Sequence, residues 1–174
     1  KYSNKSEVPA TIIFAGQGNA TVVNRIIGDV AEVRKDAIVC ISPVRTNVVN
    51  NVGSEATSIA SWADTVTRST YAFADSGWKY QYDKYNDVYV YVPLNADVAG
   101  CMARNDLNAE AWLSPAGFNA GRIQNLVRLA FNPTQAERDT LYKTAVNPVT
   151  TQVGRGTVLF GDKTFVTRNT STNR

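Results

Sequence analysis

The sequence of 174 residues contains no histidine, and this absence excludes several classes of enzyme. Without an imidazole there is no Ser-His-Asp or Cys-His catalysis, no histidine acid–base chemistry and no zinc site that needs a histidine ligand. The chain has two cysteines, Cys40 and Cys101, which are too few for a four-thiolate metal site or a disulfide framework. Because both stand among apolar residues, we expect two reduced thiols in the core.

Charge and long apolar runs are also scarce. Charged residues make up 19% of the chain and the formal net charge is +3, which gives no reason to expect nucleic acid or an anionic membrane as a partner. The apolar runs are far shorter than the roughly 20 residues that a bilayer span requires. The length fits one domain with one core, over residues 1–174. Since the first residue is Lys1 rather than Met, we expect this domain to be a segment of a longer protein.

A strand, a helix and a second strand are predicted near the start of the chain. Residues 11–15 form a short β-branched and aromatic run, and Asn19 is a candidate N-cap. Apolar residues recur at helical spacing across residues 20–35. Residues 37–41 are apolar on both faces, as is typical of a central parallel strand. These segments predict a βαβ unit.

The middle of the chain is predicted to contain two helices separated by an aromatic segment. The first helix covers residues 54–66 with Ser54 as its cap, and the second covers residues 94–104. Residues 71–92 hold most of the tyrosines, a density that suggests a long loop or an edge segment with half-buried rings.

The last third of the chain is predicted to alternate between strands and one helix. Residues 123–131 alternate as a strand with one solvated face. A helix follows, with Asn132 as its cap and Gln135 at the capping-box position. Two strands, 157–160 and 164–167, are expected to form a hairpin. The pattern therefore predicts an α/β fold with a doubly wound, mainly parallel sheet flanked by helices and an antiparallel hairpin near the C-terminus.

Two glycine-containing segments resemble phosphate-binding loops without matching them. Gly16 and Gly18 begin a dinucleotide fingerprint, but Thr21 occupies the third glycine position. Residues 156–164 differ from a Walker A loop by the insertion of Asp162, whose carboxylate would repel a phosphate. A tight turn and a hairpin explain these glycines better, and a nucleotide-binding α/β enzyme remains an alternative hypothesis. The residue pattern predicts no catalytic, cofactor or metal site.

The tyrosine-rich segment is a poor candidate for a nucleic-acid site. Its rings could in principle stack on bases in a single-stranded groove. Its three aspartates, however, outnumber its two lysines, so the segment lacks the cationic field that holds a phosphate backbone. The acidic residues are Asp75, Asp83 and Asp87, and the basic ones are Lys79 and Lys84.

Six segments resemble, in order, the core domain of the contractile tail sheath proteins of myovirus-type bacteriophages. The resemblance covers the chain from about Val30 to Lys163. The segments are KYQYDKYND (79–87), VPLNADVAG with ARND (92–106), WLSPAGFN (112–119), NPTQAERDTLY (132–142), VNP (146–148) and GTVLFGDKT (156–164).

This resemblance implies a structural protein without enzyme activity or cofactor. It implies a subtilisin-like fold that lacks the protease triad, in agreement with the missing histidine. Many copies would stack as rings or a helix around the tail tube and contract to drive the tube through the host envelope. The implied partners are further copies of the chain, the tail tube protein, and baseplate and tail terminator proteins, with no nucleic acid and no membrane insertion. The implied location is the virion tail, assembled in the host bacterial cytoplasm. A tailocin or secretion-system sheath is the nearest alternative.

The chain departs from the family pattern at Ala120, where a basic residue is expected, so that charge is either missing or moved to Arg122. Family members also continue into terminal extensions, and we expect the segment alone to fold without forming a contractile sheath. Polar and aromatic surface residues are candidate contacts between subunits. They are Trp78, Tyr80, Tyr82, Tyr85, Arg122, Arg128, Arg138 and Lys143.

Overall fold

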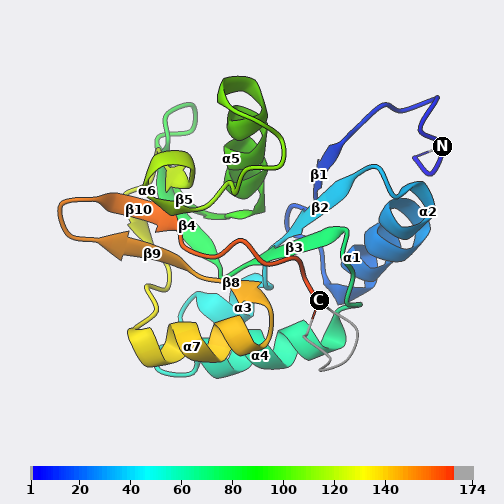
Figure 1. The fold of residues 1–174 in the computed structure, drawn as a ribbon. Helices are drawn as coiled ribbons and strands as arrows, with labels where there is room; N and C mark the ends of the chain where they lie inside the picture. Colours follow the sequence, from blue (N-terminus) through cyan, green and yellow to red (C-terminus); the bar gives the residue numbers. More distant parts are fainter. Residues whose placement is uncertain (1, 167–174) are drawn as a thin grey trace.

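A four-stranded parallel sheet forms the centre of the protein in a computed structural model that describes residues 2–166 (Figure 1). In order across the sheet, the strands are β1 (Ile12–Phe14), β2 (Ile38–Ile41), β3 (Ala72–Asp75) and β8 (Val146–Asn147). The first two confirm the strands predicted at residues 11–15 and 37–41. The order runs in one direction, so this sheet lacks the reversal of strand order that we predicted for a doubly wound sheet.

The connection from β1 to β2 is helical from Ala20 to Arg34, in agreement with the helix predicted for residues 20–35. It consists of α1 (Ala20–Ile26), a π-helical turn η1 (Ile27–Ala31) and α2 (Glu32–Arg34). Asn19 caps the helix, because its Oδ1 accepts a hydrogen bond from the backbone N–H of Val22 at 3.0 Å. Val23 and Ile27 are four residues apart and both are buried in the core beneath the sheet. The predicted βαβ unit is therefore confirmed, with β1 and β2 parallel.

Helices cover both faces of the parallel sheet, as predicted. The helices α1, α3 (Arg45–Val48), α4 (Glu55–Thr65) and α7 (Gln135–Lys143) share one core, and α5 (Asn95–Asn108) packs in a second core. Successive residues of β2 alternate between these cores, since Val39 and Ile41 lie in the first and Cys40 in the second. The central strands β2 and β3 are thus covered on both sides, which explains the continuous apolar sequence of β2.

The helices α4 and α5 confirm the two predicted in the middle of the chain, with two differences. The side chain of Ser54 makes no capping bond, and the carboxylate of Glu55 instead accepts the Gly53 N–H at 2.7 Å. The helix α5 begins at the predicted place but extends to Asn108, beyond the predicted end at residue 104.

Two antiparallel sheets flank the parallel one, whereas the sequence predicted only one antiparallel hairpin beside it. One contains β5 (Val88–Pro93), β4 (Trp78–Asp83) and β7 (Arg128–Leu129) in that order. The other contains β6 (Arg122–Ile123), β10 (Gly156–Leu159) and β9 (Val149–Gln152). Within the described residues, six of the ten strands are therefore antiparallel.

Two predicted segments are corrected by these sheets. Of the two forms predicted for residues 71–92, the long loop is wrong, because they contain β3 and the hairpin of β4 and β5; the edge segment is nearer, since β5 is an edge strand. Residues 123–131 are not one strand, because β6 and β7 pair with different sheets. Asn125 lies between them with a φ of +55°, a backbone conformation that breaks an extended run.

The predicted capping box of α7 is present but two residues later than expected. The Thr134 hydroxyl and the Glu137 carboxylate form it, and the Thr134 N–H donates to Glu137 Oε2 at 2.7 Å. Asn132, the predicted cap, instead accepts the Thr151 N–H at 2.8 Å. A short helix, α6 (Gly117–Ala120), lies between α5 and β6.

The predicted hairpin of residues 157–160 and 164–167 was wrong, because β10 pairs with β9 and β6 instead. An antiparallel hairpin near the C-terminus does exist, formed by β9 and β10. After β10 the chain crosses back to the parallel sheet, where the Phe165 N–H donates to the Ala72 carbonyl at 2.8 Å. Residue 167 lies outside the described residues.

Asn147 holds this returning segment in place. Its Nδ2 donates to the carbonyls of Ala74 and Lys163 at 3.0 and 2.8 Å, and its Oδ1 accepts the Lys163 N–H at 2.9 Å. Gly161 passes so close that a Cβ there would lie 2.6 Å from Asn147 Oδ1.

Gly161→Ala is therefore expected to lower the free energy of unfolding by about 1–3 kcal/mol, as overpacking does. Urea denaturation of the purified chain followed by circular dichroism measures the change. Gly100→Ala is the control, because Gly100 lies inside α5 with open space around it, and we expect it to be neutral or to stabilise by up to about 1 kcal/mol. A Gly161→Ala chain as stable as the control would contradict the clash.

Candidate functional site

The hairpin of β4 and β5 presents four tyrosines on one face. Tyr80 lies opposite Tyr91 and Tyr82 lies opposite Tyr89, so alternate positions of both strands carry a ring. The ring centroids of Tyr80 and Tyr89 are 5.4 Å apart and stacked, and those of Tyr82 and Tyr89 are 5.1 Å apart. Because Tyr89 is 55% exposed, this ladder of rings is a surface rather than a core. We call these four residues the tyrosine ladder.

Two arginines border the tyrosine ladder. The Arg128 guanidinium lies 5.2 Å from the Tyr80 ring centroid, and its Nη2 donates to the Tyr91 hydroxyl at 3.2 Å. Arg45 lies 5.6 Å from the Tyr91 ring centroid. Cation–π contacts of this kind hold both guanidinium groups beside the rings, which gives the surface a mixed aromatic and cationic character.

The turn that joins β4 to β5 carries two fixed carboxylates. Asp83 accepts hydrogen bonds from Asn86 Nδ2 at 2.7 Å and from the Tyr85 N–H at 3.0 Å, and these bonds lower the pKa of Asp83. Asp87 accepts the Tyr82 hydroxyl at 2.6 Å, which raises the pKa of Tyr82. Tyr85 itself is 85% exposed. We call residues 83–87 the hairpin tip; it extends beyond the strands of its sheet (Figure 1).

The prediction that Trp78 is a surface contact was wrong, because the structure places it in the core. Its side chain is 2% exposed, and its indole N–H donates to the Pro43 carbonyl at 2.7 Å. The sequence placed Trp78 beside the tyrosines, and it does share their face of β4, but the first core covers the start of the strand and buries its ring. The remaining candidates, Tyr80, Tyr82 and Tyr85, lie on the tyrosine ladder or the hairpin tip.

The four basic candidates lie on two neighbouring parts of the molecule. Arg122 and Arg128 line one surface groove of about 610 Å³ between β6 and β7. Arg138 is on α7, 5.6 Å from the Phe160 ring centroid, and Lys143 is exposed at the end of the same helix. The structure thus brings Arg122 and Arg128 together and leaves Arg138 and Lys143 on the helix.

Sequence reasoning missed Arg45, Tyr89 and Tyr91 as members of this surface. The signal for the tyrosines was present, because Tyr80 and Tyr82 before the turn and Tyr89 and Tyr91 after it alternate as strand residues do. No sequence signal marks Arg45, since it belongs to α3, which is far from the hairpin in the sequence.

The Gly16–Gly18 turn accepts a hydrogen bond from a side chain of the protein itself. The Gly16 carbonyl accepts the Asn95 Nδ2 at 2.7 Å, and the Asn95 N–H donates to Ser42 Oγ at 2.9 Å. Residues 2–166 hold no group of three or more Cys, Asp or Glu side chains placed to bind a metal ion. Within the same residues, no helix has the length and apolar character needed to cross a bilayer.

A buried carboxyl group lies at the carboxyl end of β3. Asp75 is 1% exposed; its Oδ2 contacts Ser42 Oγ at 2.7 Å and its Oδ1 accepts the Gly77 N–H at 2.9 Å. Burial raises the pKa of Asp75 to about 8, against the two hydrogen bonds, and the negative charge of Asp97 acts in the same direction as burial. Asp97 is paired with Lys79 at 2.8 Å. The carboxyl edge of a parallel sheet is a common place for active sites, but this group is enclosed by protein.

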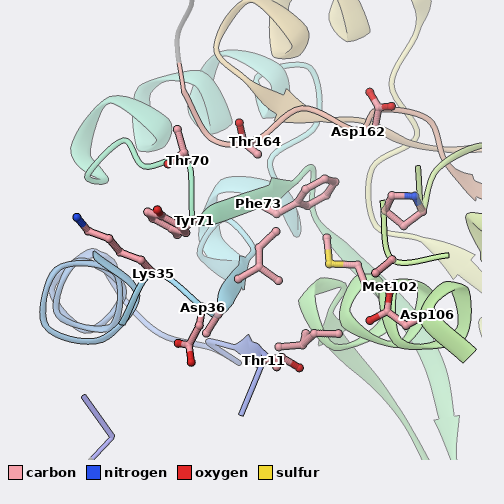
Figure 2. Close-up of a pocket in the computed structure, with 15 residues that line it drawn as sticks. Thr11, Lys35, Asp36, Thr70, Tyr71, Phe73, Met102, Asp106, Asp162 and Thr164 are labelled. Atoms are coloured by element: carbon pink, nitrogen blue, oxygen red, sulfur yellow. The ribbon is translucent and has the colours of Figure 1, made fainter. Parts of the chain in front are cut away.

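The amino ends of the parallel strands border a second cavity, of about 400 Å³ (Figure 2). Figure 2 shows Tyr71, Phe73 and Met102 beside it and carboxylates around its rim. One of these, Asp36, is paired with Arg34 at 2.9 Å, and this hydrogen bond lowers its pKa. The cavity therefore combines apolar walls with carboxylates but has no nucleophile or base in an activated pair.

Both cysteines are buried and unpaired, as predicted. Burial raises the pKa of Cys40 to about 12, and it also raises the pKa of Cys101. A thiol in this state is a poor nucleophile, so neither residue has the properties of a reactive cysteine.

The chain is similar in sequence to known proteins. The sequence model of the family described as "Phage tail sheath protein central domain" matches residues 5–165. The tail sheath protein of Enterobacteria phage T4 is 40% identical over 179 residues, an alignment that covers 94% of this chain and 27% of that protein. The tail sheath protein of Vibrio phage KVP40 is 40% identical over 83% of this chain and 24% of its own length. The chain thus spans about a quarter of these relatives.

Solved structures show the same fold at low sequence identity. A chain in the baseplate of the anti-feeding prophage is 15% identical, with a TM-score of 0.64 over 89% of this chain and 38% of that chain. A chain of the sheath complex of the extracellular contractile injection system PVC, in its contracted state, is 18% identical, with a TM-score of 0.61 over 78% of this chain and 35% of that chain. The mixed α/β fold, with one parallel sheet and antiparallel sheets, is shared with these assemblies.

Proposed function

Because the chain belongs to the phage tail sheath protein family, whose central domain it matches, we propose that it forms the core of a structural subunit of a contractile phage tail sheath. In this proposal many copies polymerise around the tail tube and contract to drive the tube through the host envelope. The observation that carries the proposal is the 40% identity to a T4 tail sheath protein over 94% of the chain.

The proposed mechanism is mechanical rather than catalytic. Subunits move largely as rigid bodies between two lattices, and the free-energy difference comes from contacts between subunits. The two apolar cores and the sheet covered on both faces support a rigid body of this kind. The proposed partners are further copies of the protein, the tail tube, and baseplate and tail terminator proteins, in a virion tail assembled in the host cytoplasm. A subtilisin-like relationship of the parallel sheet is part of the same proposal.

Electron microscopy of the full-length protein that contains this chain tests the proposal. Expressed alone or with the tail tube protein from the same genome, the protein is expected to form hollow tubes of regular width. Absence of tubes under both conditions would argue against a sheath subunit.

A sheath subunit of a related injection machine, such as a tailocin or a secretion system, is the second candidate. The fold likeness to the anti-feeding prophage and PVC structures favours it. The genes next to the coding sequence separate the two, because head and capsid genes accompany a phage tail only. A nucleotide-binding enzyme is the remaining alternative, and a flat thermal shift with millimolar ATP and NAD would remove it.

The tyrosine ladder and the basic residues near it are the proposed contacts between subunits. Tyr82→Ala is expected to reduce tube formation several-fold, while the loss of one exposed ring contact costs the fold about 1 kcal/mol. Counting tubes in micrographs at equal protein concentration measures the first effect, and thermal unfolding measures the second. Tyr2→Ala removes an exposed tyrosine elsewhere and serves as the control. Equal numbers of tubes for Tyr82→Ala and Tyr2→Ala would mean that the tyrosine ladder is not a contact between subunits.

A further inference from the structure

The positive charge of the protein is concentrated in one stretch of sequence. Residues 111–161 contain five basic and two acidic residues, whereas the rest of the chain contains thirteen of each. The whole formal net charge of +3 therefore lies in the part of the chain that forms α6, β6, β7, α7 and the strands after it. Residues 111–136 contain no acidic residue at all.

The fold gathers two of these charges in a groove with room for a ligand. Arg122 and Arg128 line the surface groove between β6 and β7, together with the amide side chains of Gln124, Asn125 and Asn132. Arg122 forms no ion pair within residues 2–166, and no carboxylate lines the groove. Unbalanced cations beside amide groups favour a carboxylate-bearing partner. We call this surface the basic groove.

The hairpin tip has the opposite properties. It projects from its sheet, carries two carboxylates against the single charge of Lys84, and exposes Tyr85 between them. The hydrogen bonds to Asp83 and Asp87 fix both carboxylates in place, so little side-chain freedom remains to be lost on binding. Tyr85 also matches an apolar residue of the basic groove, Val127, which is 61% exposed.

We propose that the hairpin tip of one copy of this chain inserts into the basic groove of the next copy. The inference rests on the proposed function, because a sheath needs contacts that join different surfaces of successive subunits. A contact of this kind, between a projection and a groove, is heterologous and leaves each copy with one free tip and one free groove. Repetition of such a contact produces a ring or a helix rather than a closed dimer.

Two variants with opposite charge changes test the contact. Arg122→Glu with Arg128→Gln changes the two arginine charges of the groove from +2 to −1; we call this the groove variant. Asp83→Asn with Asp87→Asn changes the charge of the tip from −1 to +1 while keeping one acceptor oxygen at each position, for the Tyr85 N–H and the Tyr82 hydroxyl; we call this the tip variant. Asparagine also tolerates the φ of +53° at position 87.

In the full-length protein, each variant alone is expected to self-associate about tenfold more weakly than the wild type at low salt, because like charges then meet. An equimolar mixture of the two is expected to recover assembly, since each contact again joins opposite charges. Sedimentation and electron microscopy measure both. Arg25→Glu with Lys5→Gln makes the same change in net charge as the groove variant at exposed sites elsewhere, and it should assemble normally.

Every result of this experiment is decisive. Normal assembly of either variant alone, or failure of the mixture to recover, overturns the contact while the sheath function stands. If the wild type forms no tubes, the proposed function fails. The contact is then judged from sedimentation of the same protein, where no self-association at about 1 mM would overturn it as well.

Discussion

Replacing Trp78 by alanine is expected to lower the free energy of unfolding by about 3–5 kcal/mol, which is the usual cost of removing a buried tryptophan. The indole is 2% exposed and packs in the core that the parallel sheet shares with α1, α4 and α7. Removal of the indole also leaves the Pro43 carbonyl without its hydrogen-bond donor. Chemical denaturation followed by far-ultraviolet circular dichroism measures the loss.

Trp112→Ala is the matched control, because Trp112 is 80% exposed and its removal should change stability by less than about 0.5 kcal/mol. Trp78→Phe should lie between the two, since it keeps most of the apolar volume and loses only the hydrogen bond. If Trp78→Ala and Trp112→Ala were equally stable, Trp78 would not be a core residue. The prediction that it contacts another subunit at the surface would then be favoured.

Asp75→Asn is expected to stabilise the protein at pH 8 and to have a much smaller effect at pH 4. In the folded protein the pKa of Asp75 is about 8, whereas an unfolded aspartate titrates near pH 4. Between these values the folded state holds a proton that the unfolded state has lost, so stability falls as the pH rises, by up to about 1.4 kcal/mol per pH unit. Asparagine mimics the protonated carboxyl group, since its Nδ2 can donate to Ser42 and its Oδ1 can accept from Gly77.

The measured quantity is the difference in unfolding free energy between Asp75→Asn and the wild type, from urea curves at pH 4, 6 and 8. This difference should grow with pH. The groups that face Asp75, namely Asp97 with its partner Lys79 and the Cys40 thiol, are unchanged in both proteins and cancel to first order. Asp29→Asn, at an exposed aspartate, should give a difference that does not rise with pH. A constant difference for Asp75→Asn would mean that Asp75 is ionised in the fold.

Local patterns predicted the parts of the fold that depend on nearby residues. The helical spacing of Val23 and Ile27 and the cap at Asn19 determine the first crossover, and the sequence contains both. The long-range pairings could not be predicted in the same way. The strands β8 and β9 follow α7 along the chain. The pairing of β8 with β3, which lies about seventy residues earlier, could not be predicted from the residues near β8. The cap of α7 was misplaced because Asn132 and Thr134 offer equivalent signals two residues apart, and tertiary contact with Thr151 recruits Asn132 elsewhere.

The candidate site was predicted in composition better than in geometry. Tyrosines and arginines near residues 80–85 and 122–128 were identified, and the fold brings these two segments together through the pairing of Tyr80 with Arg128. The direction of each side chain depends on strand register, which a loop interpretation of residues 71–92 could not provide. Trp78 shares one face of β4 with Tyr80 and Tyr82, and it is buried because the first core covers the start of the strand, which depends on long-range packing.

The return of the chain to the parallel sheet has a consequence for folding during synthesis. Phe165 is fully buried and bonds to Ala72 and Ser69, which the ribosome makes more than ninety residues earlier. The core beneath the sheet therefore stays open at this edge until residue 165 has emerged, and contacts this distant in sequence form slowly. During that interval the start of β3 and the ring of Trp62 remain without their final neighbour. Until residue 165 has emerged, the apolar surface at this edge of the sheet therefore stays exposed.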